Sequence, residues 1–293
     1  MKNKKIKVGI IGTGNIGSDL LVKIQRSDVL TCALFIGKNP QSENIKRAAS
    51  MGIRISHQSI KAIEENPDLC DIIFDATSAQ VHATHAPILK KLRKFTIDLT
   101  PSGIGKMCIP LINIEEALAA PNVNMVSCGA QATIPIISAL MNVHRETQYV
   151  EIVSSIASRS AGIGTRDNID ELTQSTSEAI KTFTNVPRAK TIIIFNPAEP
   201  PIHMHNTVYA KIENPKLDLL TAKVYAVVEK IKKYVPGYRL TLDPVYENDR
   251  LTVMTEVVGL GDFLPVFSGN LDIMNCAAIA VAEGYAHKKL LIS

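Results

Sequence analysis

The chain has 293 residues, of which 46% are hydrophobic and 20% charged, and its formal net charge is +4. This length is enough for two domains with a sizeable core, and the composition is ordinary for a globular protein. The lysines and arginines are scattered apart from residues 90–94, which we interpret as a solvated helix end, so a nucleic-acid partner is not expected. Because no apolar run could span a membrane and no cleavable signal follows the basic N-terminus, we predict a cytoplasmic protein without membrane contact.

The cysteines indicate the redox environment. Their number is odd, their spacing is wide, and none forms a C-x-x-C pair: Cys32, Cys70, Cys108, Cys128 and Cys276. This pattern predicts reduced thiols, with neither a disulfide framework nor a zinc site.

The first part of the chain alternates between strand and helix patterns. Apolar runs predict strands at 7–11, 30–36, 72–75, 95–98 and 123–127, and helical periodicity predicts helices at 15–26, 44–51 and 81–92. Such alternation is typical of a parallel sheet with right-handed crossovers, so the predicted class is α/β with an N-terminal Rossmann-type sheet. Ligands bind at the carboxyl ends of such strands, and near these ends lie Gly12, Thr77, Thr100 and Cys128. We therefore expect one crevice to hold a cofactor and a nucleophile.

The first predicted strand leads directly into a glycine-rich turn with the pattern Gly12-x-Gly14-x-x-Gly17, and a helical pattern follows. In this context Gly12 makes a tight turn, Gly14 lets a pyrophosphate approach the backbone, and Gly17 lets the helix pack on the strand. The N-terminus of the helix then holds the phosphates. The pattern predicts a dinucleotide site.

Cys128 follows an apolar run and precedes a Gly-Ala turn, after which a helix is predicted at 134–143. A thiol near a helix N-terminus experiences the orphan amides and the helix dipole, which lower its pKa and make it a nucleophile. The alternative is a buried cysteine with a purely structural role. This segment alone leaves both possibilities open.

The spacing changes after residue 143. Strands are predicted at 149–157, 191–195, 207–212 and 251–258, and helices at 169–182, 217–234 and 273–287. The pattern predicts a second α+β domain with a mixed or antiparallel sheet, and we expect the last helix to pack back on the first domain. The predicted domains are 1–127 with 270–293 for the cofactor, and 128–269 for catalysis and dimerisation.

Residues 158–167 contain two glycines, three hydroxyl side chains and two arginines between a strand and a helix. Such a loop offers amides and guanidinium groups to phosphates or carboxylates. The alternative is an ordinary loop in which Asp167 or Asn168 caps the helix.

The histidines are less informative. His203 and His205 alternate along an extended segment, but no third ligand has suitable spacing, so no metal site is predicted. His82 and His85 are interpreted as residues on the surface of a helix.

The motifs occur in an order that resembles the CoA-acylating acetaldehyde dehydrogenases coupled to a 4-hydroxy-2-oxovalerate aldolase in aromatic catabolism. The matching segments run through nearly the whole chain: 12–17, 75–79, 98–101, 124–135, 158–170, 196–201 and 269–274. The resemblance implies that Cys128 carries an acyl thioester, with CoA as co-substrate. It also implies a homodimer and a complex with the aldolase. The residues implied in NAD binding are Gly12, Thr13, Gly14, Asn15, Ile16, Gly17, Arg159, Ser160, Ala161, Gly162, Ile163, Gly164, Thr165, Arg166, Asp167 and Asn270.

Three positions depart from the family pattern. Asn206 stands where the family has an aspartate, so any activation of water or thiol by that carboxylate is done differently here. Asn39, beside Lys38, replaces an aspartate that would bind the ribose hydroxyls of NAD, which weakens discrimination against NADP. The segment 240–253 is shorter than in the family, in the domain expected to contact partners.

The implied mechanism is attack of Cys128 on the aldehyde, hydride transfer to the nicotinamide, and passage of the acyl group to CoA. The amides after Cys128 are candidates for the oxyanion site, and no general base is evident. A semialdehyde or acyl-phosphate reductase would share the strand, the turn and the cysteine. A non-catalytic NAD-binding regulator is the other alternative, suggested by Asn206 and the short segment.

Overall fold

The computed structural model describes residues 5–162, 165–166 and 168–292. The chain divides into two compact units. Unit 1 contains the residues up to Met125 and those from Asn275 onward, and unit 2 contains Val126–Met274.

Unit 1 is built on a parallel sheet that has seven strands within the described residues. The strand order is β3 (Ile55–Ser56), β2 (Leu30–Ile36), β1 (Ile6–Ile11), β4 (Ile72–Asp75), β5 (Phe95–Asp98), β7 (Asn122–Asn124) and β6 (Lys106–Met107). All of the pairings are parallel, which confirms the predicted sheet. The two-residue strands β3 and β6 were not predicted, since they are too short to show a period.

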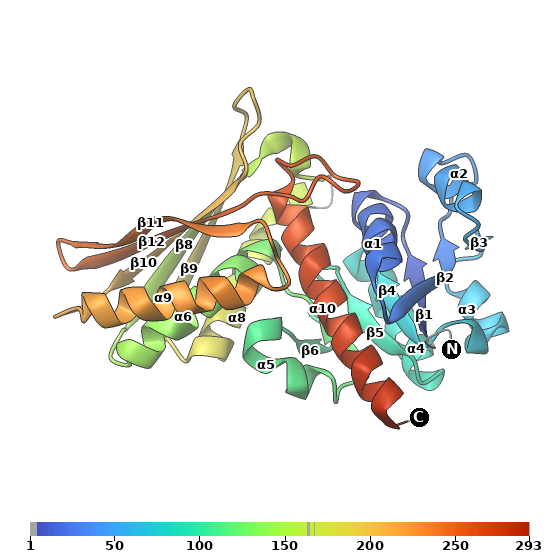
Figure 1. The fold of residues 1–293 in the computed structure, drawn as a ribbon, viewed down its shortest axis with the longest axis horizontal. Coiled ribbons are helices and arrows are strands. Elements are labelled where there is room, and N and C mark those ends of the chain that lie inside the picture. The colour runs from blue at the N-terminus through green and yellow to red at the C-terminus, as the bar shows by residue number, and fades with distance from the viewer. Residues whose placement is uncertain (1–4, 163–164, 167, 293) are drawn as a thin grey trace. The chain divides into compact units, whose positions relative to one another are not determined.

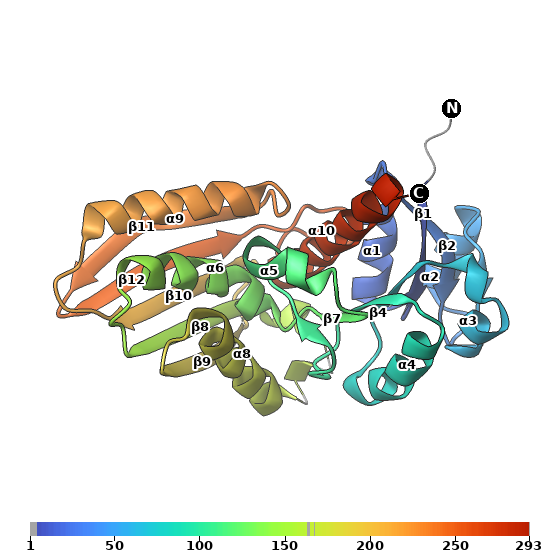
Figure 2. The same cartoon turned by 90° about the horizontal axis from the view of Figure 1, so that it is seen from below.

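Helices cover both faces of this sheet (Figure 2). One face carries α1 (Asn15–Arg26) and the later part of α10 (Gly269–Ile292), and the other carries α4 (Ala79–Lys91). The remaining helices of unit 1 are short: α2 (Glu43–Ser50), α3 (Lys61–Glu65), η1 (Pro67–Leu69) and α5 (Pro110–Ala117). Between the layers lie fully buried apolar side chains such as Ile10, Phe74 and Ile97.

The C-terminal helix packs on this unit as the sequence predicts, although it is longer than the predicted 273–287. Tyr285 stacks on Phe95 of β5 with ring centroids 4.1 Å apart. Asn275 Nδ2 donates to the buried Asp19 Oδ2 of α1 at 2.8 Å. These contacts join the end of the chain to its first helix.

Unit 2 is a five-stranded mixed sheet within the described residues. The order is β11 (Tyr238–Glu247), β12 (Arg250–Val257), β10 (Met204–Lys211), β8 (Tyr149–Ala157) and β9 (Arg188–Asn196), and only β8 and β9 are parallel. The mixed character agrees with the prediction, but β11 was not expected to be a strand. In Figure 1 three helices lie on one face of the sheet: α6 (Cys128–Val143), α8 (Ile169–Thr184) and α9 (Leu217–Lys232).

The start of α6 differs from the prediction. The helix begins at Cys128 rather than at Ile134, because Ser127 Oγ accepts a hydrogen bond from the amide of Ala130 at 3.1 Å and caps the first turn. Residues 129–137 are buried, and this packing holds the helix through Pro135. Every helix in the described part of the chain is too short or too polar to cross a membrane.

Candidate functional site

The glycine turn of unit 1 connects β1 to α1. Gly12 has φ +110°, and a Cβ added there would lie 2.4 Å from the carbonyl oxygen of Ala76. A Cβ on Gly17 would lie 1.9 Å from the carbonyl oxygen of Gly12, whereas one on Gly14 would meet no described atom within 4 Å. The turn is therefore closed on two sides and open at Gly14, where α1 begins. This geometry fits the pyrophosphate of a dinucleotide on free helix amides.

The residues around this turn leave part of it accessible. Thr13, Gly14 and Asn15 are partly or fully exposed, and Thr13 accepts a hydrogen bond from Asn44 Nδ2 through its carbonyl oxygen at 2.8 Å. Asn39 follows β2, is exposed, and uses its Oδ1 to accept from the amide of Gln41 at 2.9 Å. This hydrogen bond closes the turn that follows β2, the strand next to β1 and its glycine turn.

Cys128 is the first residue of α6 in unit 2, and it is half-buried. The chain enters the helix through Val126, which has φ +63°. A β-branched residue with positive φ is a steric outlier, and such strain gathers at functional sites. The capping residue Ser127 also shares a hydrogen bond with Thr176 of α8 at 2.7 Å, so two helices hold the start of α6.

Burial raises the pKa of the Cys128 thiol to about 11, while the backbone amides of Gly129 and Cys128 lower it. The prediction of a lowered pKa from the helix N-terminus is therefore wrong. The amides of the helix N-terminus are present as expected, but the loss of water around the sulfur outweighs them.

A row of polar side chains lies beneath the first turn of α6. A Cβ on Gly129 would lie 3.2 Å from Ser154 Oγ of β8, and Ser154 donates to Asn206 Oδ1 of β10 at 2.8 Å. Asn206 pairs in register with Thr255 of β12. Asn206 Nδ2 is buried and has no hydrogen-bond partner among the described residues. Such a group costs about 1–3 kcal/mol, so the row is a place where a ligand or water belongs.

The sequence indicated Asn206 only through the family resemblance, and it missed Thr255. Both residues fall on buried positions of their strands. The alternation of a strand does not show whether a buried polar residue belongs to a binding site or has only a structural role. The cross-strand register brings them together.

The loop after β8 is held by its own arginine. Arg166 donates from its guanidinium group to the carbonyl oxygen of Ser158 at 2.6 Å, and it lies 4.9 Å from the centroid of the Phe195 ring. Arg159 instead pairs with Glu199 at 2.7 Å, with both side chains more than half exposed. Arg166 is therefore committed to the loop, and Arg159 is the more accessible cation.

The other residues predicted in this region are placed as follows. Ser160 is buried and donates to the carbonyl oxygen of Ala157, Ala161 is buried, and Gly162 is exposed. Asn270 is 4% exposed, and its Oδ1 lacks a partner among the described residues. Thr165 is partly exposed. Ile163, Gly164 and Asp167 lie outside the described residues. This set belongs to unit 2, and the glycine turn belongs to unit 1.

His82 and His85 are buried, at 0% and 3% exposure, so the prediction that they lie on a helix surface is wrong. Both donate from Nδ1 to the same oxygen, Oδ2 of Asp75 in β4, at 2.9 and 2.8 Å. The other oxygen of Asp75 accepts from the amide and the hydroxyl of Thr77. Both histidines lie on the side of α4 that faces the sheet, where the buried Asp75 carboxylate binds them. The helical period of the segment does not reveal this carboxylate, because it lies on another element.

The same network continues into β5. His82 Nε2 lies 3.5 Å from Asp98 Oδ2, and Asn122 of β7 lies 3.0 Å from the same nitrogen. Asp98 accepts from the amide of Thr100, from the hydroxyl of Ser102, and from Asn124 Nδ2. Burial alone raises the pKa of Asp75, but the hydrogen bonds from His82, His85 and Thr77 bring it down to about 2. Burial raises the pKa of Asp98 and outweighs its donors.

Glu256 of β12 contacts two further histidines, His203 and His205. His203 Nδ1 lies 2.7 Å and His205 Nε2 3.6 Å from its Oε1, and Arg239 donates to its second oxygen. Burial alone would raise the pKa of Glu256, but the hydrogen bonds of Arg239 and His203 lower it. The described residues contain no group of three side chains arranged to hold a metal ion.

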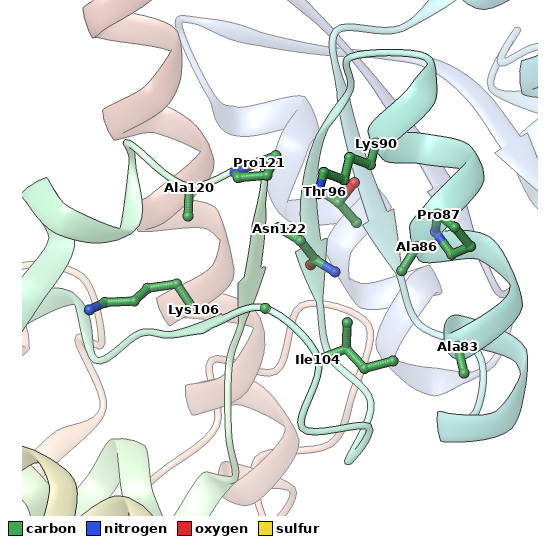
Figure 3. Close-up of a pocket in the computed structure, with 11 residues that line it drawn as sticks. Ala83, Ala86, Pro87, Lys90, Thr96, Ile104, Lys106, Ala120, Pro121 and Asn122 are labelled. Atoms are coloured by element: carbon green, nitrogen blue, oxygen red, sulfur yellow. The ribbon is translucent and has the colours of Figure 1, made fainter.

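Unit 1 also has a groove of about 380 Å³ beside α4, shown in Figure 3. It lies among α4, the segment before β6 and the start of β7, and its lining is mostly apolar. The residues are Ala83, Ala86, Pro87, Lys90, Thr96, Ile104, Gly105, Lys106, Ala120, Pro121 and Asn122. None of these was predicted to bind cofactor or substrate, and Asn122 connects the groove to His82.

Comparison with known proteins gives matches over nearly the whole chain. Residues 7–105 match a family model described as the NAD binding domain of semialdehyde dehydrogenase, and residues 128–265 match one described as prokaryotic acetaldehyde dehydrogenase, dimerisation. The chain is 52% identical to an acetaldehyde dehydrogenase of Pectobacterium atrosepticum, with 96% of both chains covered. It is 47% identical to one of Geobacillus stearothermophilus, with 98% of both covered.

A solved structure supports the fold independently. Aspartate semialdehyde dehydrogenase II of Vibrio cholerae superposes with a TM-score of 0.64 at 15% identity, covering 99% of both chains. At this identity the likeness concerns the fold alone, and it agrees with the predicted parallel sheet followed by an α+β unit.

Proposed function

The chain belongs to the acetaldehyde dehydrogenase family, and from this membership we infer that it oxidises acetaldehyde with NAD through a thioester on Cys128. It is an NAD-dependent aldehyde oxidoreductase. The observation that carries the role of Cys128 is its place at the capped N-terminus of α6, the helix whose first turn lies over Ser154 and Asn206, and Asn206 Nδ2 is a buried donor without a partner among the described residues. The alternatives, a semialdehyde or acyl-phosphate reductase and a non-catalytic regulator, are less favoured by the family relationship.

NAD fits the glycine turn of unit 1. Gly14 provides an open approach, and the first amides of α1 face the space that a pyrophosphate would fill. When bound, NAD supplies the acceptor for a hydride. We propose Thr13, Asn15 and Ile16 as further contacts at this turn. From the family resemblance we also propose Arg159, Gly162, Thr165 and Asn270 as NAD-binding residues.

The residues of unit 2 suggest how the chemistry proceeds. The sulfur of Cys128 bonds to the carbonyl carbon of the aldehyde, and the thiol proton is released to water. The amides of the first turn of α6 and Asn206 Nδ2 supply donors for the oxygen that becomes negative. Loss of hydride from the carbon leaves a thioester on Cys128. We propose that the thiol of CoA then takes the acyl group and frees the cysteine.

The test is NADH formation from acetaldehyde with and without CoA, in the native chain and in Cys128→Ala. We expect sustained, CoA-dependent turnover in the native chain and loss of activity in the variant, with NAD binding retained. Cys276→Ala is the matched control, since that cysteine lies in α10 and has no proposed role. Near-native turnover by Cys128→Ala would refute the proposal, and phosphate-dependent turnover without CoA would favour the acyl-phosphate reductase.

Unit 2 contains the matched dimerisation domain, which supports a homodimer. We propose that the sheet face not covered by α6, α8 and α9 forms the interface. A row of residues in register crosses all five strands on that face: Ile192, Val153, Thr207, Met254 and Leu242. Four of the five are apolar, and Leu242 is 50% exposed. Burying such a row against a second copy removes it from water.

We further propose a complex with a 4-hydroxy-2-oxovalerate aldolase and a role in the breakdown of aromatic compounds, because direct transfer keeps a reactive aldehyde away from water and amines. Co-expression of the two proteins followed by size-exclusion chromatography with light scattering tests the complex. We expect co-elution, and separate elution at micromolar concentration would contradict a stable complex.

A further inference from the structure

The buried network in unit 1 contains two carboxylates and a histidine between them. Every described atom that contacts the oxygens of Asp75 belongs to an amide, a hydroxyl or an imidazole nitrogen, and each of these groups is able to donate. The contacts of Asp98 are likewise an amide, a hydroxyl, a carboxamide nitrogen and His82. These donors favour the ionised form of each carboxyl group.

His82 joins these two carboxylates through its two ring nitrogens. Nδ1 lies 2.9 Å from Asp75 Oδ2, and Nε2 lies 3.5 Å from Asp98 Oδ2. A neutral ring carries one hydrogen and satisfies one side only, whereas an imidazolium donates to both. Burial lowers the pKa of His82, but Asp75 and Asp98 outweigh it and raise the pKa above its ordinary value. The other titratable group packed here is His85, on the same helix, which faces Asp75 and Ser59.

Asn122 adapts to either charge state of His82. As placed, its Nδ2 faces His82 Nε2 at 3.0 Å, which suits a neutral ring, and its Oδ1 is buried without a partner among the described residues. Turning the amide by 180° puts Oδ1 toward Nε2, where it accepts a hydrogen bond from an imidazolium. Each placement pairs one end of the amide and leaves the other without a partner, so the proton on His82 decides which one is present.

The network reaches the cofactor turn through the end of β4. Asp75 Oδ1 holds the amide and the hydroxyl of Thr77, and the carbonyl of Asp75 accepts from the amide of Leu99 at 3.0 Å. Between them, Ala76 donates to the carbonyl oxygen of Ile11 at 2.8 Å, and its own carbonyl is the surface against which Gly12 lies. The backbone of Ala76 therefore packs against Gly12, and its position limits where the glycine turn can lie.

We propose that His82, as an imidazolium between Asp75 and Asp98, is a positioning residue for NAD that holds the ends of β4 and β5 against the glycine turn. Loss of its proton leaves two buried carboxylates facing each other without a cation between them. Their repulsion displaces Ala76 and Thr77 and thereby the turn. Proton binding at His82 and NAD binding at the turn are then coupled, although the two sites do not touch. The inference rests on the NAD site proposed at Gly12–Gly17.

The test is the pH dependence of the NAD dissociation constant, measured by calorimetry on the full chain from pH 6 to pH 9. In the native chain we expect the dissociation constant to rise by about fivefold or more between pH 6 and pH 9. About fivefold is the smallest change in affinity that is typical of two coupled binding sites. In His82→Gln, whose amide does not titrate, we expect weaker binding than native at pH 6 and a flat profile. A purely structural role would weaken binding equally at every pH and leave the native slope in place.

His85→Gln is the matched control, because His85 binds the same Asp75 oxygen but does not reach Asp98. We expect it to keep the native slope. A slope in His82→Gln equal to that of the native chain overturns the proposal, as does loss of the slope in His85→Gln. Either result leaves the NAD site itself intact, whereas absence of NAD binding in the native chain would refute the proposed function instead.

A second measurement needs no variant. Because coupling is reciprocal, NAD must raise the pKa of His82 by the logarithm of the fold-change in affinity. NMR of the ¹⁵N-labelled imidazole, with and without saturating NAD, reports this pKa and the protonation of both nitrogens. We expect two protonated nitrogens at pH 7 and an upward shift with NAD, and an unchanged pKa would refute the coupling even if His82→Gln does not fold.

Discussion

At the scale of single residues, Cys128 experiences two opposing influences. The amides at the start of α6 favour a thiolate, whereas burial favours the neutral thiol, and burial prevails. A cysteine held as a thiol at neutral pH is protected from stray oxidation and alkylation. Formation of the thiolate then requires a change in the surroundings of the sulfur, such as the binding of substrate or cofactor. The polar row formed by Ser154, Asn206 and Thr255 lies under the first turn of α6, which Cys128 begins.

The pH dependence of alkylation tests this balance. With a thiol pKa of about 11, the thiolate fraction of Cys128 is small at pH 7 and increases about tenfold per pH unit up to pH 10. We expect the iodoacetamide rate at Cys128, followed by peptide mass spectrometry, to rise accordingly without levelling. Free cysteine, whose pKa is about 8.5, is the reference and levels off above pH 9. A plateau for Cys128 near pH 8 would show that the amides prevail.

Asn39 bears on the choice between NAD and NADP. Its neutral side chain follows β2 where an acid would repel a 2′-phosphate, so we expect NAD to be preferred over NADP only weakly. Asn39→Asp should sharpen that preference by adding charge repulsion against NADP and a ribose acceptor for NAD. The measurement is the ratio of kcat/KM values for the two cofactors. An unchanged ratio would mean that residue 39 does not reach the ribose.

At the scale of elements, α4 is attached to the sheet by charge as well as by packing. The helix carries His82 and His85, and both bind the Asp75 carboxylate at the end of β4. The lowered pKa of Asp75 means that its contribution to stability is present above its ordinary pKa and is lost as the pH falls toward about 2. The raised pKa of His82 means that its contribution is present below its ordinary pKa and is lost as the pH rises through the folded value.

Asp75→Asn should therefore destabilise unit 1 strongly. Removing one partner from a buried charged network costs about 3–5 kcal/mol, because the remaining groups lose their compensation. We expect a lower urea midpoint at pH 7 and a smaller loss of stability on acidification than in the native chain. Asp68→Asn, on the exposed face of η1, is the control and should lie within about 0.5 kcal/mol of native. Equal midpoints for the two variants would contradict the assigned role.

At the scale of the whole molecule, the two faces of the sheet in unit 2 differ. Helices cover one face, and the other presents the row from Ile192 to Leu242 with half-buried side chains. The matched dimerisation domain covers these strands. An apolar row of this kind is what a second copy would cover.

Placing charge in this row should separate the dimer. We expect the double variant Met254→Glu with Leu242→Glu to elute as a monomer in size-exclusion chromatography with light scattering, because two buried carboxylates per copy would face each other without partners. Leu219→Glu is the matched control, since Leu219 is 49% exposed on α9 and Leu242 is 50% exposed on β11. A double variant that remains dimeric would place the interface elsewhere.

The sequence by itself determined the parallel sheet of unit 1, the glycine turn and the position of Cys128 between two segments of regular structure. These features depend on neighbouring residues: strand and helix periods, a strand that runs into spaced glycines, and motifs in family order. The boundaries of β2, β4, β5 and β8 agree with the predicted ranges because turn residues limit them on both sides.

Only the tertiary structure decided which polar groups are buried together. His82 and His85 face the sheet because Asp75 lies there, and Arg166 is committed to the loop by Ser158, Ala161 and Phe195. The direction of the pKa shift at Cys128 was also decided at this level, since it depends on how many atoms enclose the sulfur. A local pattern specifies which way a side chain points within its own element. It does not specify what another element places opposite it.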